Sequence, residues 1–112
     1  MVQYQATLTA AFAAVANPTR RGILERLGRQ EASISELADA FGMTLTGMKK
    51  HVQLLEDAGL VATKKIGRVR TCTLGVRRLA DEAAWISRYQ AMVEARFDSL
   101  EALLENIKGD EQ

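Results

Sequence analysis

Residues 33–59 read SISELADAFGMTLTGMKKHVQLLEDAG, and they contain the start and stop signals of two short helices. Ser33 followed by Glu36 has the spacing of a capping box, and Ser35 is a rival N-cap. Gly42 can take the left-handed conformation that closes a helix. The first half of the stretch therefore predicts a short helix that ends in a tight glycine turn.

The second helix of this stretch has two chemically different faces. Thr44 is its candidate N-cap, and Gly59 is the glycine expected just after its end. Its apolar residues recur at spacings of three and four: Leu45, Met48, Val52 and Leu55. The last three of them form the stripe that we expect to face the core. The outward positions carry small or hydrogen-bonding side chains: Thr46, Gly47, Lys49, Lys50 and Gln53. A major-groove reader needs such a division, so the stretch predicts a DNA-binding helix-turn-helix over residues 33–58.

Two β-rich runs follow, and they predict a two-stranded hairpin over residues 60–74 with Gly67 at its turn. Because an isolated hairpin is only marginally stable in water, it must lean on the helices. Four basic side chains crowd its tip: Lys64, Lys65, Arg68 and Arg70. A basic hairpin beside a helix-turn-helix is typical of a wing that contacts phosphates or the minor groove. The alternative is a solvated hairpin whose lysines discourage edge-to-edge aggregation.

Apolar stripes predict further helices on both sides of this region. We expect a first helix over residues 6–16, and Asn17-Pro18 starts the next one as N-cap and first helical residue. The last helix, over residues 76–108, contains no proline or glycine and is roughly 50 Å long at 1.5 Å per residue. The rest of the chain cannot cover so much apolar length, which favours pairing with the same helix of a second chain over folding back. We expect a homodimer with these interface residues: Leu8, Phe12, Ile86, Tyr89, Val93, Phe97, Leu100 and Leu104.

Composition agrees with one small domain over residues 1–112. Aromatic residues make up 5% and proline occurs once, which favours a mainly α fold with a small β-hairpin. No apolar run reaches the ~18 residues of a membrane span, so no membrane partner is expected. The Ala-rich residues 10–16 follow no lysine or arginine, unlike a signal peptide, and we expect a cytoplasmic protein.

Charge and chemistry-bearing residues point to a binding protein. Residues 44–78 carry a net charge of +6, between a neutral first segment and a last segment of −5, which suggests one face for a polyanion. One cysteine and one histidine exclude a disulfide within the chain and zinc sites of several Cys or His, so we expect no metal and no cofactor. The sequence offers no nucleophile–base set and no glycine-rich phosphate loop, so an enzyme is not expected.

Three segments together resemble the ArsR family of bacterial winged helix-turn-helix repressors: NPTRRGIL at 17–24, SELA at 35–38 and KHVQLLEDAGLV at 50–61. The resemblance implies a homodimer whose two recognition helices meet one face of double-stranded DNA and repress by occupying an operator. Two-fold symmetry makes that operator an inverted repeat. We expect the DNA contacts from this set: Thr44, Thr46, Gly47, Lys49, Lys50, His51, Gln53, Lys64, Lys65, Arg68 and Arg70.

The chain departs from the metal-sensing members of that family. Their Cys pairs before the turn are replaced here by ISELAD at residues 34–39, and the last helix contains no histidine. The sequence therefore resembles a metal-independent branch. Lys49 replaces a serine common at the start of the recognition helix, so we expect a different operator. A winged-helix module that binds protein without specific DNA binding is the alternative function.

Several single residues leave two readings open. His51 lies near the DNA backbone by resemblance, or it is a half-buried histidine that bonds a neighbouring carbonyl. Arg20 and Arg21 start a helix, where positive charge is unfavourable, and each contacts either a phosphate or a carboxylate. Cys72 is expected to be a small buried hydrophobe rather than a redox sensor. Aromatic and apolar side chains of the last helix are expected at an interface rather than in an effector pocket: Trp85, Tyr89, Met92 and Phe97.

Overall fold

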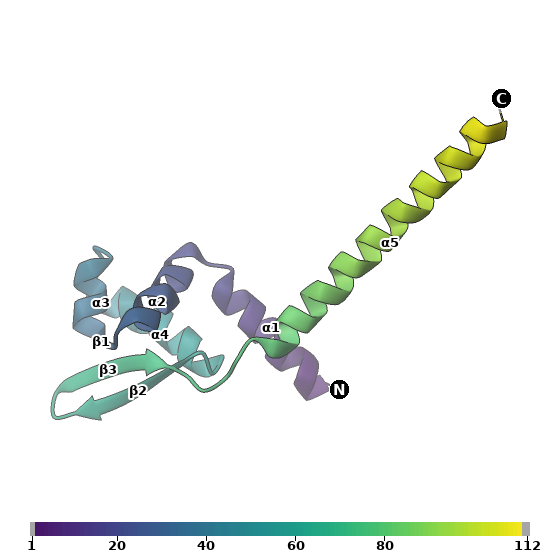
Figure 1. Cartoon of the computed structure of the whole chain (residues 1–112). Helices are drawn as coiled ribbons and strands as arrows, with labels where there is room; N and C mark the ends of the chain where they lie inside the picture. Colours follow the sequence, from purple (N-terminus) through teal and green to yellow (C-terminus); the bar gives the residue numbers. More distant parts are fainter. Residues whose placement is uncertain (1, 111–112) are drawn as a thin grey trace. The chain divides into compact units, whose positions relative to one another are not determined.

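The structure, a computed structural model, describes residues 2–110. The chain divides into two compact units, Met1–Leu79 and Ala80–Gln112. The second unit is the single uninterrupted helix α5, Ala80–Asp110 (Figure 1). Nowhere in residues 2–110 is there a helix with both the length and the apolarity needed to cross a bilayer.

The first unit is a winged helix-turn-helix, as the sequence predicts. Its elements in chain order are α1 (Val2–Val15), α2 (Pro18–Arg29), β1 (Ala32–Ser33), α3 (Ile34–Ala40), α4 (Leu45–Asp57), β2 (Val61–Ile66) and β3 (Val69–Leu74). The packing of α3 against α4 forms the helix-turn-helix, and β2 with β3 forms the wing.

Two helix starts differ from the expected ones. The first helix begins at Val2 rather than near residue 6, because residues 2–5 contain no helix breaker.

The last helix begins at Ala80 rather than residue 76, because the preceding chain is tied to the sheet end. The Gly75 N–H donates to the Leu60 carbonyl at 2.9 Å, which keeps the chain extended past the end of β3. Val76 is then almost fully exposed, so no packing favours an earlier helical turn.

Local side-chain caps fix the ends of the helix-turn-helix. Ser33 Oγ accepts from the Glu36 N–H and Glu36 Oε1 accepts from the Ser33 N–H, each at 3.0 Å, so Ser33 is the N-cap of α3. Thr44 Oγ1 accepts from the Gly47 N–H at 3.1 Å and caps α4. Gly42, with φ +63°, takes the left-handed conformation expected at the turn.

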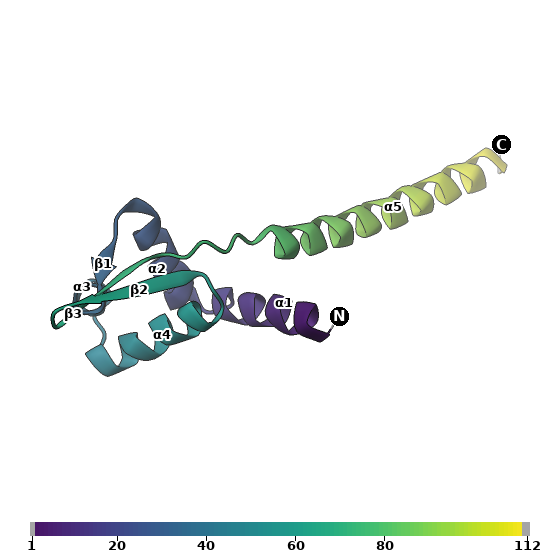
Figure 2. The same ribbon diagram turned by 90° about the horizontal axis from the view of Figure 1, so that it is seen from below.

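The sheet has a third strand that the sequence did not predict. Its order is β1-β3-β2, all antiparallel, and β1 pairs Ala32 with Cys72. The hairpin therefore leans on β1 as well as on helices, since α2 contacts β3 and α4 contacts β2 (Figure 2). A two-residue strand has no periodic pattern, so only the tertiary pairing reveals it.

The core lies where the helices meet this sheet. The expected inward stripe of α4 is confirmed, because Met48, Val52 and Leu55 are all buried. Cys72 is fully buried, as expected for a small hydrophobe, and burial raises the pKa of its thiol to about 11. The thiol is therefore protonated at neutral pH, which disfavours redox reactivity.

Gly75 marks the closest approach between the end of β3 and the turn after α4. A Cβ added there would overlap the carbonyl oxygen of Gly59, a backbone atom that cannot rotate away. We expect Gly75→Ala to lower the free energy of unfolding by about 1–3 kcal/mol, as overpacking does. Gly28→Ala is the matched control: nothing lies within 4 Å of its added Cβ, and alanine favours the helix by about 0.5 kcal/mol. Urea unfolding measures both, and a Gly75→Ala protein as stable as the unsubstituted one contradicts the packing.

Candidate nucleic-acid interface

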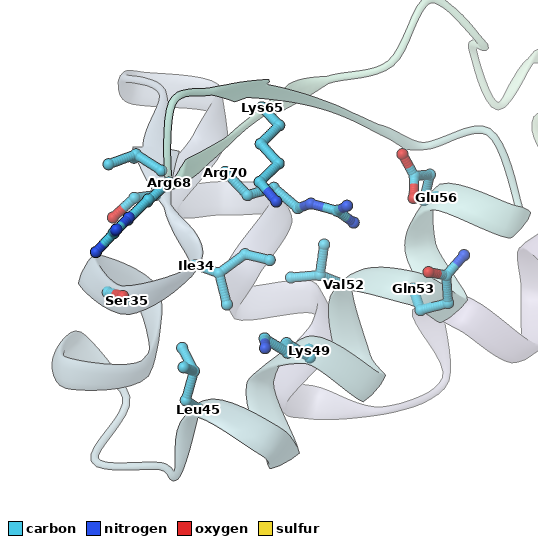
Figure 3. Close-up of a pocket in the computed structure, with 12 residues that line it drawn as sticks. Ile34, Ser35, Leu45, Lys49, Val52, Gln53, Glu56, Lys65, Arg68 and Arg70 are labelled. Atoms are coloured by element: carbon cyan, nitrogen blue, oxygen red, sulfur yellow. The ribbon is translucent and has the colours of Figure 1, made fainter.

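A cleft of about 470 Å³ separates the recognition helix α4 from the wing. The α4 wall is formed by Leu45, Lys49, Val52, Gln53 and Glu56. The facing wall comes from the hairpin: Lys65, Arg68, Val69 and Arg70. The start of α3 closes one end with Ser33, Ile34 and Ser35. Figure 3 shows Lys65 and Arg70 extending from the hairpin into the space above Val52, with Lys49 opposite.

The cleft is cationic above an apolar floor. Lys49, Lys65, Arg68 and Arg70 carry positive charge, whereas Ile34 and Val52 are buried beneath them. One carboxylate lies among these cations, and it is held by the wing: Thr63 Oγ1 donates to Glu56 Oε2 at 2.6 Å. That hydrogen bond joins the last turn of α4 to β2. The helix and the wing therefore present their cations as one surface.

The structure brings together some of the residues expected to contact DNA. Lys49, Gln53, Lys65, Arg68 and Arg70 share the cleft. The others lie outside its walls, exposed or half-buried: Thr44, Thr46, Gly47, Lys50, His51 and Lys64. Lys64 lies outside the cleft because successive side chains of a strand point to opposite faces of the sheet, and its neighbour Lys65 points into the cleft. For all of these residues, contact with DNA stays a prediction.

Gln53 is held in one orientation by its own helix. Its Nε2 donates to Asp57 Oδ1 at 2.8 Å, one helical turn further on. A glutamine amide has two N–H donors and an acceptor oxygen, so one bonded N–H leaves the capacity for a bidentate contact. A fixed amide on a rigid helix is suited to a base edge.

Arg20 and Arg21 bond backbone carbonyls, and neither a phosphate nor a carboxylate was needed to explain their positions. Arg20 Nε donates to the Ala14 carbonyl at 2.8 Å and its Nη2 to the Ala13 carbonyl at 3.0 Å. Arg21 Nη1 donates to the Val15 carbonyl at 2.8 Å. The expectation of a phosphate or a carboxylate missed this arrangement, in which both guanidinium groups bond the last carbonyls of α1. Positive charge at a helix C-terminus is favourable.

Arg20 also contacts the recognition helix. Its Nη1 lies 3.3 Å from His51 Nδ1, and because arginine can only donate, the ring nitrogen accepts. His51 is half-buried, as one of its two readings has it, but its bonding partner is a guanidinium and not a neighbouring carbonyl. The other reading, a position near the DNA backbone, stays a prediction. Burial, together with the charge of Arg20, lowers the pKa of His51 below its usual 6.5. The histidine is therefore neutral at pH 7.

The lowered pKa of His51 predicts a loss of stability in mild acid. Well above pH 6.5 the ring is neutral in both the folded and the unfolded chain, so it has no effect on stability. Below that pH the unfolded chain binds the proton more readily, so the free energy of unfolding falls until the folded-state pKa is passed. His51→Gln should remove this part of the pH dependence. An NMR titration of the single histidine reads the pKa directly, and a value at or above 6.5 contradicts the contact with Arg20.

Helix α5 carries a long row of exposed apolar side chains. Among the expected interface residues, Ile86, Tyr89, Phe97 and Leu104 are at least half exposed, Leu100 somewhat less, and Val93 is partly buried. On α1, Leu8 and Phe12 are partly buried. Trp85 stacks on Tyr89, with ring centroids 5.7 Å apart and planes 6° from parallel. Among the residues that the structure describes, no group of three or more His, Cys, Asp or Glu side chains is arranged so that it could hold a metal ion.

Known proteins similar to this chain share its architecture. Residues 15–64 match a family model described as a helix-turn-helix domain. The crystal structure of an ArsR family transcriptional regulator, RHA00566, is 44% identical to this chain and has a TM-score of 0.74. The alignment covers 84% of this chain and 97% of that one.

Two further relatives carry more specific descriptions. The transcriptional repressor SdpR of Bacillus subtilis (strain 168) is 24% identical over 78 residues, which cover 70% of this chain and 87% of SdpR. The homodimeric winged helix-turn-helix DNA-binding domain of Mb0332 from Mycobacterium bovis is 25% identical, with a TM-score of 0.62. That alignment covers 87% of this chain and 83% of the other.

Proposed function

Because this chain belongs to the ArsR family of winged helix-turn-helix transcriptional regulators, we propose that it is a homodimeric repressor that occupies an inverted-repeat operator. The relatives described above are named as a transcriptional regulator, a transcriptional repressor and a DNA-binding domain, and none of the three is named as an enzyme. Double-stranded DNA and a second copy of the chain are its proposed partners. A repressor of this kind acts where chromosomal DNA lies, which we propose is the cytoplasm.

The cationic cleft between α4 and the wing is the observation that carries the proposal. A rigid helix contributes Lys49 and Gln53, and a hairpin contributes Lys65, Arg68 and Arg70. The helix suits base edges in the major groove, whereas long flexible cations on a hairpin suit phosphates. The two halves of the cleft therefore match the two kinds of contact that a sequence-specific DNA-binding protein makes.

The apolar side of α5 supports the homodimer. A row of large apolar side chains in water is unfavourable, and a second copy of the same helix is the simplest cover. The homodimeric state of the Mycobacterium bovis domain supports self-association of this chain. We propose that the row on α5 contributes to the dimer interface, and that Leu8 and Phe12 of α1 do so as well.

A protein-interaction module is the second candidate, and the charge of the cleft argues against it. Protein interfaces deplete lysine at their centre, whereas Lys49 and Lys65 face each other across this cleft. DNA phosphates match such a surface better.

A gel-shift assay separates the two functions. We expect purified protein to shift one fragment of the DNA that flanks its gene, and unlabelled random DNA should not compete. Because we propose that DNA binding needs no metal ion, the shifted band should persist when a chelator is added. Equal binding to all fragments, or none, would favour the protein-interaction module.

A further inference from the structure

We propose that Leu45 reads the C5-methyl group of a thymine in each operator half-site. The inference rests on the proposed function and names one base contact within the same surface. It begins from a difference between two kinds of apolar residue on α4. Met48, Val52 and Leu55 are at most 2% exposed, whereas Leu45 is 44% exposed although it shares their spacing. The protein therefore leaves nearly half of the Leu45 surface uncovered.

The position of Leu45 on α4 ties it to the residues proposed to meet base edges. Leu45, Lys49 and Gln53 are four residues apart, so they lie one above another along a single helix face. All three line the cleft, and Figure 3 shows them along the same wall. Leu45 is also the first residue of α4. In a helix-turn-helix, the N-terminal residues of the recognition helix contact the base edges.

The chemistry of this wall selects the base. Thymine is the base that presents a methyl group in the major groove, and an aliphatic side chain recognises it by apolar contact. Lys49 beside Leu45 and the cations of the wing opposite require an anionic occupant. Duplex DNA with a thymine at this position meets both requirements. Its phosphates match the cations, and its methyl group covers the exposed leucine.

The size of the effect follows from the group that is buried. One methyl-sized group is worth about fourfold in affinity at a single contact. Two symmetric half-sites double the free energy, so removing both methyl groups should weaken a dimer about 15-fold.

Deoxyuridine lacks only the methyl group of thymidine, so it tests the contact directly. Operator duplexes are made with one symmetric pair of thymidines replaced at a time, and affinities are measured by fluorescence anisotropy at constant salt. We expect one pair to weaken the unsubstituted protein about 15-fold. The Leu45→Ala protein should bind the deoxyuridine duplex and the thymidine duplex with equal affinity.

Leu54→Ala is the matched control. Leu54 is 50% exposed on the same helix, nine residues on and so on the opposite face, and its variant should keep the full sensitivity to the methyl group. The inference is wrong if no replacement weakens the unsubstituted protein, or if Leu45→Ala keeps the sensitivity. In either case specific binding to the thymidine operator would leave the proposed function intact. Binding with no sequence preference would overturn both.

Discussion

Phe97→Glu is expected to convert the homodimer into a monomer and to lower operator affinity by about 10²–10⁴-fold. Phe97 is 61% exposed on α5, in the apolar row that we propose a second copy covers. A buried, unpaired carboxylate costs far more than the contact it replaces, so the charged helix should not pair. Each monomer then binds one half-site on its own. In the dimer, binding of the first half-site holds the second recognition helix at a high effective concentration near the other half-site, and the monomer lacks this gain. Leu100→Glu should act in the same way.

Sedimentation equilibrium measures the first step of this prediction. The unsubstituted chain should have twice its 12.3 kDa mass at micromolar concentration, and Phe97→Glu should have 12.3 kDa. Ala91→Glu is the matched control, because it adds the same charge at an exposed position of α5 that lies on the side away from the apolar row. A 12.3 kDa unsubstituted protein, or a dimeric Phe97→Glu protein with full affinity, would show that α5 does not hold the dimer.

Gln53→Ala and Arg68→Ala are expected to change DNA binding in different ways. Gln53 lies on a rigid helix and its amide is fixed by Asp57, so its loss should cost about 1–3 kcal/mol at one base pair of each half-site and relax specificity there. Arg68 follows Gly67 at the tip of the wing, where a long cation suits a phosphate. Its loss should weaken all sequences alike and reduce the salt slope by about 1 for each protomer.

Affinity for operator variants at several salt concentrations separates these two effects. Arg29→Ala is the control for charge, because it removes an exposed cation of α2 that does not line the cleft. It should leave both the salt slope and the specificity unchanged. The assignment of roles would be reversed if Arg68→Ala altered base preference and Gln53→Ala did not.

Local signals explain why the helix-turn-helix could be predicted from the sequence. The capping box at Ser33 and the positive-φ glycines at 42 and 59 act within a few residues, and each is present where expected. The apolar spacing of α4 likewise identified Met48, Val52 and Leu55 as buried. Residues this close in the chain determine one another's conformation with little help from the rest of the fold.

Features that depend on distant segments could not be predicted. Arg20 bonds carbonyls six and seven residues earlier, and these acceptors come within reach only after the chain turns between α1 and α2. The pairing of Ala32 with Cys72 joins segments 40 residues apart. Helical spacing placed Leu45 with the apolar residues of α4. Spacing alone does not show which end of a helix is covered by the rest of the protein and which end is exposed. The exposure of Leu45 therefore became visible only in the structure.

Selection of binding sites from random duplex DNA tests the proposed repressor most directly. Two copies of α4 related by a two-fold axis must meet two identical half-sites. The selected sequence should therefore be an inverted repeat whose half-site centres are about one helical turn, or a multiple of it, apart. Enrichment of a site without dyad symmetry, or of no sequence at all, would contradict a homodimer that reads DNA through its recognition helices.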